Sequence, residues 1–375
     1  MEFRINIISS AILVLLAVCV ASCQRSGSDP VRIGFVADLS DRMSIIGSPG
    51  RDAAILAVEE VNRRGGIDGR SIELVYRDNK HSESRLLEQL KNLRRAGVEV
   101  VIGPMTSQMG VVAAKSSELQ GMVFLSPTVS TPELSGINDN FFRVYPHSIS
   151  LIDHLVAYLV KAENTGRVGV VLDTSNSAFS LPWGDYFVEQ MSRFGFEVVP
   201  PFRFNPEFDP LYKNLVEKIE KAQIDTLLVV ASATDLGIIS QLMRQSGRQS
   251  DIFATEWSYS AELIQFGSKA ANGIKLIHTF DEHSDDPSFI VFNKAFEDRF
   301  SYKPNFAAAY SYDATMVAIS AMTTKNKIGF AERLILLGKF KGLQTTLQFD
   351  RFGDVERPVF LSEIVDGQFR KIGSI

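Results

Sequence analysis

The apolar positions of the chain change period several times between residues 31 and 134. Short apolar runs, of which Val31–Val36 is the first, are typical of buried strands, and stretches with an apolar residue at every third or fourth position are typical of helices packed on one face. The pattern predicts strands over 31–36, 71–76, 98–102 and 122–125, and helices over 50–64, 84–96 and 107–119. Strands that alternate with helices in this way indicate a doubly wound, mostly parallel α/β sheet.

The same alternation begins again after His147. The pattern there predicts strands over 167–172, 225–230 and 252–254, a less regular one over 196–200, and helices over 185–194, 210–221 and 235–245. Residues 287–322 are predicted to be helical without an intervening strand, and the segments 345–349 and 359–365 look like a pair of strands. The chain is therefore expected to hold two α/β units, one after the other.

The first residues of the chain have the features of an export signal. Arg4 is followed by the apolar run Ala11–Val20, which is shorter than the roughly 20 apolar residues that a membrane-spanning helix needs. No later apolar run in the sequence is long enough to span a bilayer. The pattern predicts that residues 1–22 direct export and are then removed, and an uncut membrane anchor is the alternative.

A cysteine directly follows the small residues at the end of this signal. The sequence Val20–Cys23 resembles the bacterial lipobox, in which the cysteine thiol is acylated and the chain is cut just before it. The resemblance implies a lipid anchor on Cys23 and a small, polar tether over 23–30. An ordinary signal with an incidental cysteine is the alternative.

Composition and charge narrow the class of protein. The 375 residues include 45% hydrophobic and 22% charged side chains, as expected for a globular chain with a substantial core. The net charge of −5 argues against nucleic-acid binding, which needs a basic surface. Both cysteines, Cys19 and Cys23, precede the predicted fold, so the fold is expected to contain neither a disulfide nor a cysteine metal ligand.

Several motifs in the chain match one known family. The most specific is Ala-Val-Glu-Glu-Val-Asn over 57–62, followed by Gly-Gly-Ile-Asp-Gly-Arg over 65–70. Further matches lie at Gly47, Gly50, 77–79, 100–104, 126–134, 142–144 and 350–354. These motifs resemble the type I periplasmic binding proteins of the leucine/isoleucine/valine class, which capture a ligand for ABC importers. The resemblance covers nearly all of the predicted mature chain.

The resemblance implies an α/β fold of two doubly wound, Rossmann-like lobes joined by three crossovers, with the ligand in the cleft between them. The crossovers are placed near His147, Thr279 and Val355. The N-terminal lobe is expected to comprise residues 31–147 plus 280–354, and the C-terminal lobe residues 148–279 plus 355–375.

Candidate ligand contacts in the first lobe follow its third and fourth strands. Ligands of open α/β sheets bind outside the carboxyl ends of the strands. Thr106 and Ser107 open a helix, whose free N–H groups and dipole favour a carboxylate, and a plain N-cap is the alternative. After the fourth strand, the resemblance implies that the Val129 carbonyl and the Ser130 hydroxyl contact the ligand, whereas a turn closing on itself is the alternative.

Candidates in the second lobe are an acid and a tryptophan. Glu256 follows the strand 252–254 and matches the family residue that pairs with the ligand ammonium, and a solvated loop glutamate is the alternative. Trp183, with Gly184, best matches a Tyr-Gly pair of the family and is interpreted as an aromatic lid or else as a core residue. The tyrosine that the family often has near Ile46 is missing, which leaves the side chain of the ligand undefined.

The sequence lacks the motifs of an enzyme. Its five histidines form no HExxH motif, and there is no nucleophile elbow, phosphate-binding loop or dinucleotide fingerprint. His278 and His283 flank Asp281 and Glu282, but their spacing is loose for a metal site and the segment is expected to be an exposed loop. We therefore expect no catalytic residue, no metal and no cofactor.

These observations predict an exported, lipid-anchored solute-binding protein on the cell membrane, facing the periplasm or the exterior. Its expected partners are an amino acid or similar small zwitterion, around which the two lobes close, and an ABC permease in the membrane. The protein is expected to be a monomer. The alternatives are a lipoprotein of the same fold that acts by protein interaction, such as an activator of cell-wall synthases, and a ligand sensor for a signalling partner.

Overall fold

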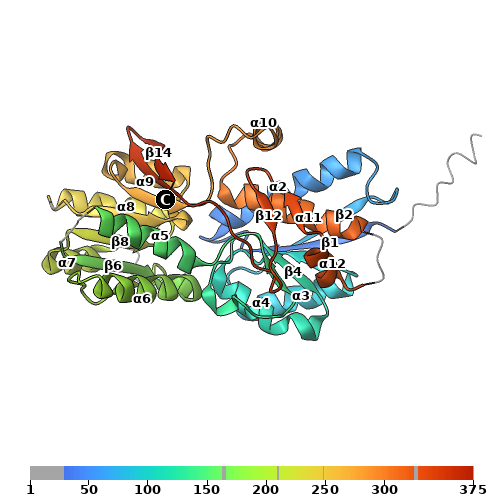
Figure 1. The fold of residues 1–375 in the computed structure, drawn as a ribbon, viewed down its shortest axis with the longest axis horizontal. Coiled ribbons are helices and arrows are strands. Elements are labelled where there is room, and N and C mark those ends of the chain that lie inside the picture. The colour runs from blue at the N-terminus through green and yellow to red at the C-terminus, as the bar shows by residue number, and fades with distance from the viewer. Residues whose placement is uncertain (1–28, 163–165, 209–210, 248, 325–327, 375) are drawn as a thin grey trace, which may run out of the picture.

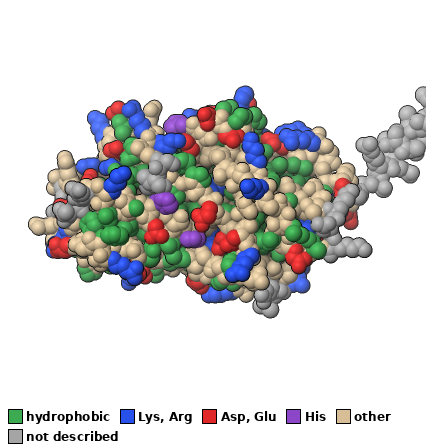
Figure 2. All heavy atoms as spheres, viewed as in Figure 1, with side chains coloured by type: hydrophobic (Ala, Val, Ile, Leu, Met, Phe, Trp, Pro, Cys, Tyr) green, Lys and Arg blue, Asp and Glu red, His purple; other side chains and the backbone are tan. Residues whose placement is uncertain are grey.

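The computed structural model describes residues 29–162, 166–208, 211–247, 249–324 and 328–374. The predicted export signal and Cys23 lie outside these residues. Within them the chain forms two α/β lobes side by side, the first on the right of Figure 1 and the second on the left. Acidic, basic and apolar side chains are interspersed over the face shown in Figure 2. Among the described helices, none combines the length and the apolar character needed to cross a bilayer.

The first lobe is built on a parallel sheet of five strands in the order β2-β1-β3-β4-β5. These strands are β1 (Val31–Ala37), β2 (Ile72–Asp78), β3 (Val100–Ile102), β4 (Val123–Ser126) and β5 (Phe141–Arg143). The helices of this part are α2 (Ser44–Arg63), α3 (Glu83–Arg95), α4 (Ser107–Gln120), α10 (Pro287–Phe300), α11 (Phe306–Thr323) and α12 (Phe330–Leu336). Helices α10 and α11, although late in the chain, pack against α2.

The second lobe is built on a seven-stranded sheet in the order β14-β13-β10-β9-β8-β6-β7, with β13 and β14 antiparallel. These strands are β6 (Val168–Asp173), β7 (Phe202–Phe204), β8 (Thr226–Val230), β9 (Asp251–Thr255), β10 (Lys275–His278), β13 (Phe360–Val365) and β14 (Gln368–Ser374). The helices are α5 (Ser148–Lys161), α6 (Ser177–Arg193), α7 (Lys213–Ala222), α8 (Ala233–Gln245) and α9 (Ala261–Gly267). Every residue of β6 and β8 is buried, as their apolar sequences predict.

The chain passes between the two lobes three times: after β5, after β10, and between the short strand β12 (Thr346–Gln348) and β13. This confirms the predicted fold class of two doubly wound lobes joined by three crossovers. Because the lobes are linked only by these segments, their relative position depends on the crossovers and on the contacts made across the cleft.

Two glycines bring the backbone close to the carboxyl ends of the first-lobe strands. A Cβ on Gly47 would lie 2.0 Å from the carbonyl oxygen of Asp38, so α2 begins this near to β1 only because residue 47 has no side chain. Gly103 has a φ of 109°, and a Cβ there would lie 2.2 Å from the Val36 carbonyl oxygen. The segments that open α2 and α4 are thus held at the edge of the sheet that faces the other lobe.

Two helices begin earlier than the sequence predicts. Helix α2 begins at Ser44 instead of residue 50, and it contains Pro49. A proline inside a helix leaves the carbonyl four residues earlier without its usual donor. Here that carbonyl, of Ile45, accepts a hydrogen bond from Asn305 Nδ2 at 3.2 Å. A tertiary contact therefore replaces the helical bond that the proline cannot make.

The second helix that begins early is the one predicted over 185–194. Helix α6 begins at Ser177 instead of residue 185 and contains Pro182. The side chain of Ser180 helps to fix this early turn, because its hydroxyl donates to the carbonyl oxygen of Asp173 at 2.6 Å. The prediction had placed the start of the helix after the proline, as the proline rule suggests.

The predicted strands are also corrected in two places. The strand that follows α6 is β7, six residues after the predicted start at 196, and only Val198 of the predicted segment forms a bridge. The strands predicted over 345–349 and 359–365, which correspond to β12 and β13, do not pair with each other. Strand β12 pairs with β11 (Lys339–Lys341), and β13 pairs with β10 and β14. Alternation gives each strand a face but not a partner, which explains this error.

A buried ion pair joins the third crossover to the first lobe. The Arg357 guanidinium donates to Asp313 Oδ2 of α11 at 3.0 Å, and both side chains are almost fully buried. Arg357 also donates to the carbonyl oxygen of Val144, on the first crossover, at 2.6 Å, and lies over the ring of Tyr310. One arginine therefore links two of the three crossovers to α11.

We predict that Arg357→Ala lowers the free energy of unfolding by about 3–5 kcal/mol, because it leaves the Asp313 carboxylate buried without its partner. Urea denaturation measures the effect. The matched control is Arg299→Ala, which breaks an exposed pair with Glu59 and is expected to cost much less than the loss of the buried pair. Equal losses in the two variants would contradict the role assigned to the buried pair.

Candidate functional site

A small cavity lies where the two sheets face each other. Its volume is about 30 Å³, which is space for about two water molecules. The residues that line it follow strands of both lobes or open neighbouring helices: Ile46, Met105, Ser107, Thr128, Tyr145, Asn176, Phe179, Trp257 and Phe306. The cavity is therefore at the carboxyl edge of both sheets, where the sequence places the ligand.

The α4 N-terminus forms one wall of this cavity. Ser107 is buried, lines the cavity and accepts a hydrogen bond from the Ser130 N–H at 3.3 Å. The next N–H, of Gln108, donates to Asn176 Oδ1 of the second lobe at 3.0 Å. Thr106 Oγ1 is buried and has no hydrogen-bond partner among the described residues. The end of α4 thus offers hydroxyls and a positive dipole toward the junction of the lobes.

The loop after β4 is partly closed on itself and partly directed to the cavity. The Ser126 hydroxyl donates to the Pro104 carbonyl at 2.7 Å and accepts from the Val129 N–H at 3.2 Å, as in a serine turn. Val129 is buried in the core of the first lobe, whereas Thr128 lines the cavity. Ser130 is buried and its hydroxyl has no partner in the described part of the chain. Thr128 was missed because hydroxyl density alone does not say which residue faces the cleft.

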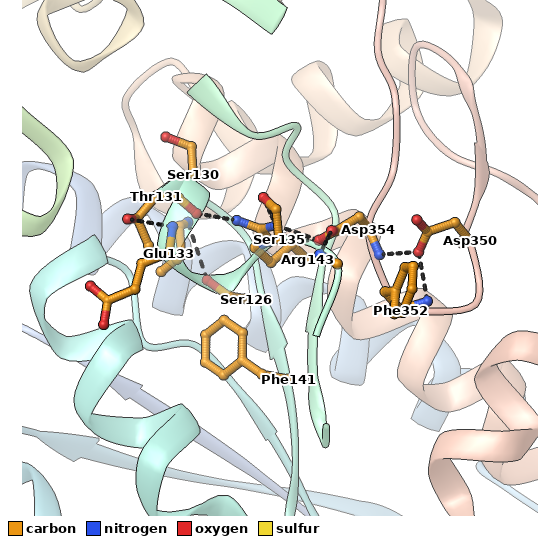
Figure 3. Close-up of polar contacts among 12 residues, drawn as sticks. Ser126, Ser130, Thr131, Glu133, Ser135, Phe141, Arg143, Asp350, Phe352 and Asp354 are labelled. Atoms are coloured by element: carbon orange, nitrogen blue, oxygen red, sulfur yellow. Dashed lines mark hydrogen bonds and ion pairs between the residues drawn. The ribbon is translucent and has the colours of Figure 1, made fainter. Parts of the chain in front are cut away.

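A buried arginine holds this loop in place (Figure 3). Arg143 of β5 donates to the Thr131 carbonyl at 2.7 Å and to Ser135 Oγ at 2.8 Å. It also donates through Nε to Asp354 Oδ1 at 2.8 Å. The motif at 350–354, which matched the family, therefore affects the site indirectly. Its Asp354 positions Arg143, and Arg143 in turn positions the loop that contains Ser130.

Glu256 begins the short helical turn after β9, and its buried carboxylate is hydrogen-bonded by side chains of the protein. Its Oε2 accepts from Tyr145 Oη at 2.5 Å and from Thr279 Oγ1 at 3.0 Å, and its Oε1 accepts from Tyr310 Oη at 3.3 Å. Burial raises the pKa of Glu256 to about 6, against the opposing effect of the bonds from Tyr145 and Thr279. Glu256 is not among the described residues that line the cavity, and Tyr145 is.

Tyr145 keeps its proton in this arrangement. Burial, together with the neighbouring Glu256 carboxylate, raises the pKa of Tyr145 well above its usual value. Its hydroxyl is therefore a donor to Glu256 at neutral pH. The sequence motif ending at Val144 stopped one residue short of this tyrosine, so the pattern gave no reason to single it out.

The aromatic wall of the cavity does not come from Trp183. Trp183 lies within α6, packed in the core of the second lobe, and its ring contacts Phe179 at a centroid distance of 6.4 Å. Phe179 lines the cavity and meets Trp257 edge to face at 5.6 Å. Trp257 Nε1 is buried without a partner in the described structure. Ile46 takes a place in the wall, where the family often has a tyrosine.

Direct contacts between the lobes close the mouth of the cleft. His81 of the first lobe contacts the Ser175 carbonyl of the second through Nε2 at 2.8 Å, and Asp38 Oδ2 through Nδ1 at 3.3 Å. Both partners are acceptors, so each ring nitrogen needs a proton. Although burial opposes the charge, the bonds to Asp38 and Ser175 raise the pKa of His81 to about 9.

A second contact across the cleft is an ion pair. Arg42, just before α2, pairs with Asp235 of α8, which is buried. Asp235 also accepts from the hydroxyl of Tyr212 at 2.5 Å and from that of Ser232 at 2.7 Å. Residues of the second lobe therefore hold Asp235 in position, and Arg42 of the first lobe pairs with it there.

The loose histidine cluster does not form a metal centre. His278 is buried and contacts the Phe280 carbonyl and the Ser362 hydroxyl, both at 2.7 Å, and burial lowers its pKa to about 4. His283 is exposed. Within the described ranges, no group of three or more His, Cys, Asp or Glu side chains could hold a metal ion.

Two doubly wound lobes, joined by three crossovers around a cavity at their junction, define a bilobed solute-binding protein. A model of the family described as periplasmic binding protein matches residues 30–368, and the chain belongs to this family. Its members are ligand-binding components of transporters, which agrees with the expectation that the chain is not an enzyme. The predicted resemblance to the leucine/isoleucine/valine class is confirmed by the individual matches.

Relatives and solved structures support this assignment. The chain is 22% identical over 304 residues to Leu/Ile/Val-binding protein BraC3 of Rhizobium johnstonii, and the aligned region covers 80% of each chain. The structure of leucine binding protein LivK from Thermotoga maritima matches with a TM-score of 0.83 at 19% identity, over 92% of this chain and 98% of that one. The isoleucine complex of LivJ from Streptococcus pneumoniae matches with a TM-score of 0.81 at 21% identity, over 91% and 98%.

We predict that the contact through His81 weakens at high pH. Because the pKa of His81 is raised above the ordinary 6.5, its contribution to the free energy of unfolding is complete below about pH 6.5 and is lost as pH rises through about 9. Melting temperatures measured from pH 6 to 10 should fall more steeply for the wild type than for His81→Ala.

The control for this measurement is His283→Ala, which removes an exposed histidine and should leave the pH profile of the wild type unchanged. Parallel profiles for the wild type and His81→Ala would refute the role given to His81.

Proposed function

We propose that this chain is an exported, lipid-anchored solute-binding protein that captures a small carboxylate-bearing solute between its lobes and delivers it to an ABC importer. Relatives of the chain are named for leucine, isoleucine and valine, which are solutes of this carboxylate-bearing kind. The observation that carries the proposal is a set of buried polar atoms without partners at the junction of the lobes, which a bound solute would satisfy.

These atoms belong to both lobes. Thr106 Oγ1 and Ser130 Oγ lie on the first lobe and Trp257 Nε1 on the second, and none has a hydrogen-bond partner among the described residues. A buried polar group without a partner costs roughly 1–3 kcal/mol, so such groups are rare unless something else binds them. Trp257 lines the cavity, and Thr106 and Ser130 lie next to Ser107, which lines it from the first lobe. This arrangement favours a ligand that touches both lobes.

The carboxylate is supported by the chemistry of the first lobe. Ser107 lines the cavity at the N-terminus of α4, a helix of 14 residues whose dipole favours an anion there. Trp257 offers an indole N–H, which can only donate. A carboxylate accepts hydrogen bonds from both kinds of group, and it is common to the amino acids named above.

Binding requires the lobes to open. The cavity of about 30 Å³ is smaller than an amino acid, and the contacts of His81 and Arg42 hold the lobes together at the mouth of the cleft. A solute that contacts both lobes would then shift the population toward its own closed form. The closed form would be the one that a membrane permease recognises, and we expect the protein to act as a monomer.

The same contacts favour a second candidate function. Two lobes that bind each other through His81 and Arg42 form a rigid body whose shape does not need a solute. A lipoprotein of this kind can act by protein interaction, for instance on a cell-wall synthase, or as a sensor for a signalling partner. Gently purified protein that carries no small carboxylate in its mass spectrum would favour this second function.

We predict that Ser107→Ala weakens the binding of a carboxylate ligand by about 10–100-fold, because a hydrogen bond to a charged group is worth roughly 1.5–3 kcal/mol. Isothermal titration with leucine and with 4-methylpentanoate measures the effect. Ser320→Ala is the control, since that serine bonds within α11 to Met316, away from the cleft. Unchanged affinity in Ser107→Ala would remove this residue from the site.

A separate prediction concerns the anchor. Cys23→Ser should move the protein from the membrane fraction to the soluble fraction of cells, because the thiol that would carry the lipid is gone. Cys19→Ser is the matched control and should leave the protein in the membrane fraction. Immunoblots of fractionated cells read out both variants, and an unchanged distribution of Cys23→Ser would speak against lipidation.

A further inference from the structure

We propose that Tyr145 makes the site selective against an α-ammonium group, so that the preferred ligand is a small carboxylate with an apolar body and no amine. The inference rests on the proposed function and names the class of solute. It is based on Glu256, the acid expected from the sequence to pair with the ammonium of a zwitterion. In the structure this carboxylate accepts hydrogen bonds from hydroxyl groups of the protein itself.

The Glu256 carboxylate is held by the protein's own hydroxyls. Tyr145 donates to Oε2, and the Thr279 and Tyr310 hydroxyls lie within hydrogen-bond distance of Oε2 and Oε1. Tyr145 is the residue of this group that also lines the cavity, so its side chain stands between Glu256 and any ligand. An ammonium could reach Glu256 only after the tyrosine hydroxyl had left it.

The crossovers hold this arrangement. Tyr145 lies on the first crossover, just after β5, and Thr279 begins the second crossover, just after β10. The Thr279 and Tyr310 hydroxyl oxygens lie 2.6 Å apart, so their two hydrogens are shared between this contact and the two contacts to Glu256. The Arg357 guanidinium of the third crossover lies 4.1 Å from the centroid of the Tyr310 ring. All three crossovers therefore meet around Glu256. The acid is hydrogen-bonded by residues of the crossovers and of α11, without any contribution from a solute.

The nitrogen groups that line the cavity can donate to a ligand, and the described part of the cavity wall carries no charged side chain. Trp257 Nε1 is a donor with no partner among the described residues. Asn176 already uses its Oδ1 to accept from the Gln108 N–H, which leaves its amide N–H groups. The Thr128 hydroxyl donates to the Met105 carbonyl. No lining residue among those described is an acid or a base, so the wall suits a carboxylate but gives an ammonium no counter-charge.

The other end of the ligand would meet hydrocarbon. Ile46, Met105, Phe179 and Phe306 line the cavity together with the Trp257 ring. Phe179 and Trp257 stand edge to face, with an interplanar angle of 89°, and form a corner into which a branched or aromatic group fits. The geometry therefore points to compounds such as short branched or aryl-substituted carboxylic acids.

The test compares pairs of ligands that differ only in the amine. Isothermal titration of the full, detergent-solubilised protein is carried out with leucine against 4-methylpentanoate, and with phenylalanine against 3-phenylpropanoate. We expect the amine-free acid of at least one pair to bind at least tenfold more tightly than its amino acid. In Tyr145→Phe, which frees a lone pair of Glu256, the amino acid of that pair should gain at least tenfold, and the acid should change by less than threefold.

Tyr186→Phe is the matched control, because it removes a tyrosine hydroxyl from an aspartate, Asp153, on the surface of the second lobe. It should change neither affinity. Tighter binding of the amino acids by the wild type would overturn this inference and leave the proposed function standing. Absence of binding to all four compounds would overturn the proposed capture of a carboxylate, and the inference with it. The wild-type comparison decides the question even where Tyr145→Phe fails to fold.

Discussion

The structure depends on a carboxylate that is buried where the three connections between the lobes meet. The hydroxyls of Tyr145, Thr279 and Tyr310 surround Glu256, and Arg357 of the buried pair with Asp313 lies over the Tyr310 ring. An acid removed from water in this way must be hydrogen-bonded or paired, because its desolvation is otherwise too costly. The need to satisfy one charge thus fixes the side chains around which two large α/β units are assembled.

Because Glu256 is used in this way, the two lobes contribute different groups to the cavity wall. The first lobe presents a helix N-terminus and hydroxyls, held in position by Arg143 through the loop that contains Ser130. The second lobe presents a tryptophan and a phenylalanine at the same cavity, while its acid faces the connections instead. Both lobes therefore contribute hydrogen-bonding groups and hydrocarbon to the wall of the cavity, and among the described residues neither contributes an acid to it. A site of this kind distinguishes ligands by their charges more than by their size.

The sequence predicted the fold class and most elements because short apolar runs alternate regularly with helical patterns, and because the family motifs fix the order of strands and helices. It failed where tertiary contacts override local rules, as when Asn305 takes the carbonyl that Pro49 leaves free. In the site, Ser107 lies at the cavity as expected. Glu256 was placed correctly after β9, but sequence spacing cannot show the direction of a side chain, and Tyr145 lies 111 positions away from it. Thr128 and Phe179 were missed for the same reason.

The bond between Gln108 N–H and Asn176 has a consequence for affinity. A residue of the second lobe uses an N–H at the positive end of α4, the pole that would also attract an anionic solute. Closure by the protein alone and closure over a solute therefore compete for the same helix end. Under such competition the apparent dissociation constant equals the intrinsic one divided by the fraction of molecules that are open. Affinity in this protein can consequently be tuned by residues at the rim that never touch the solute.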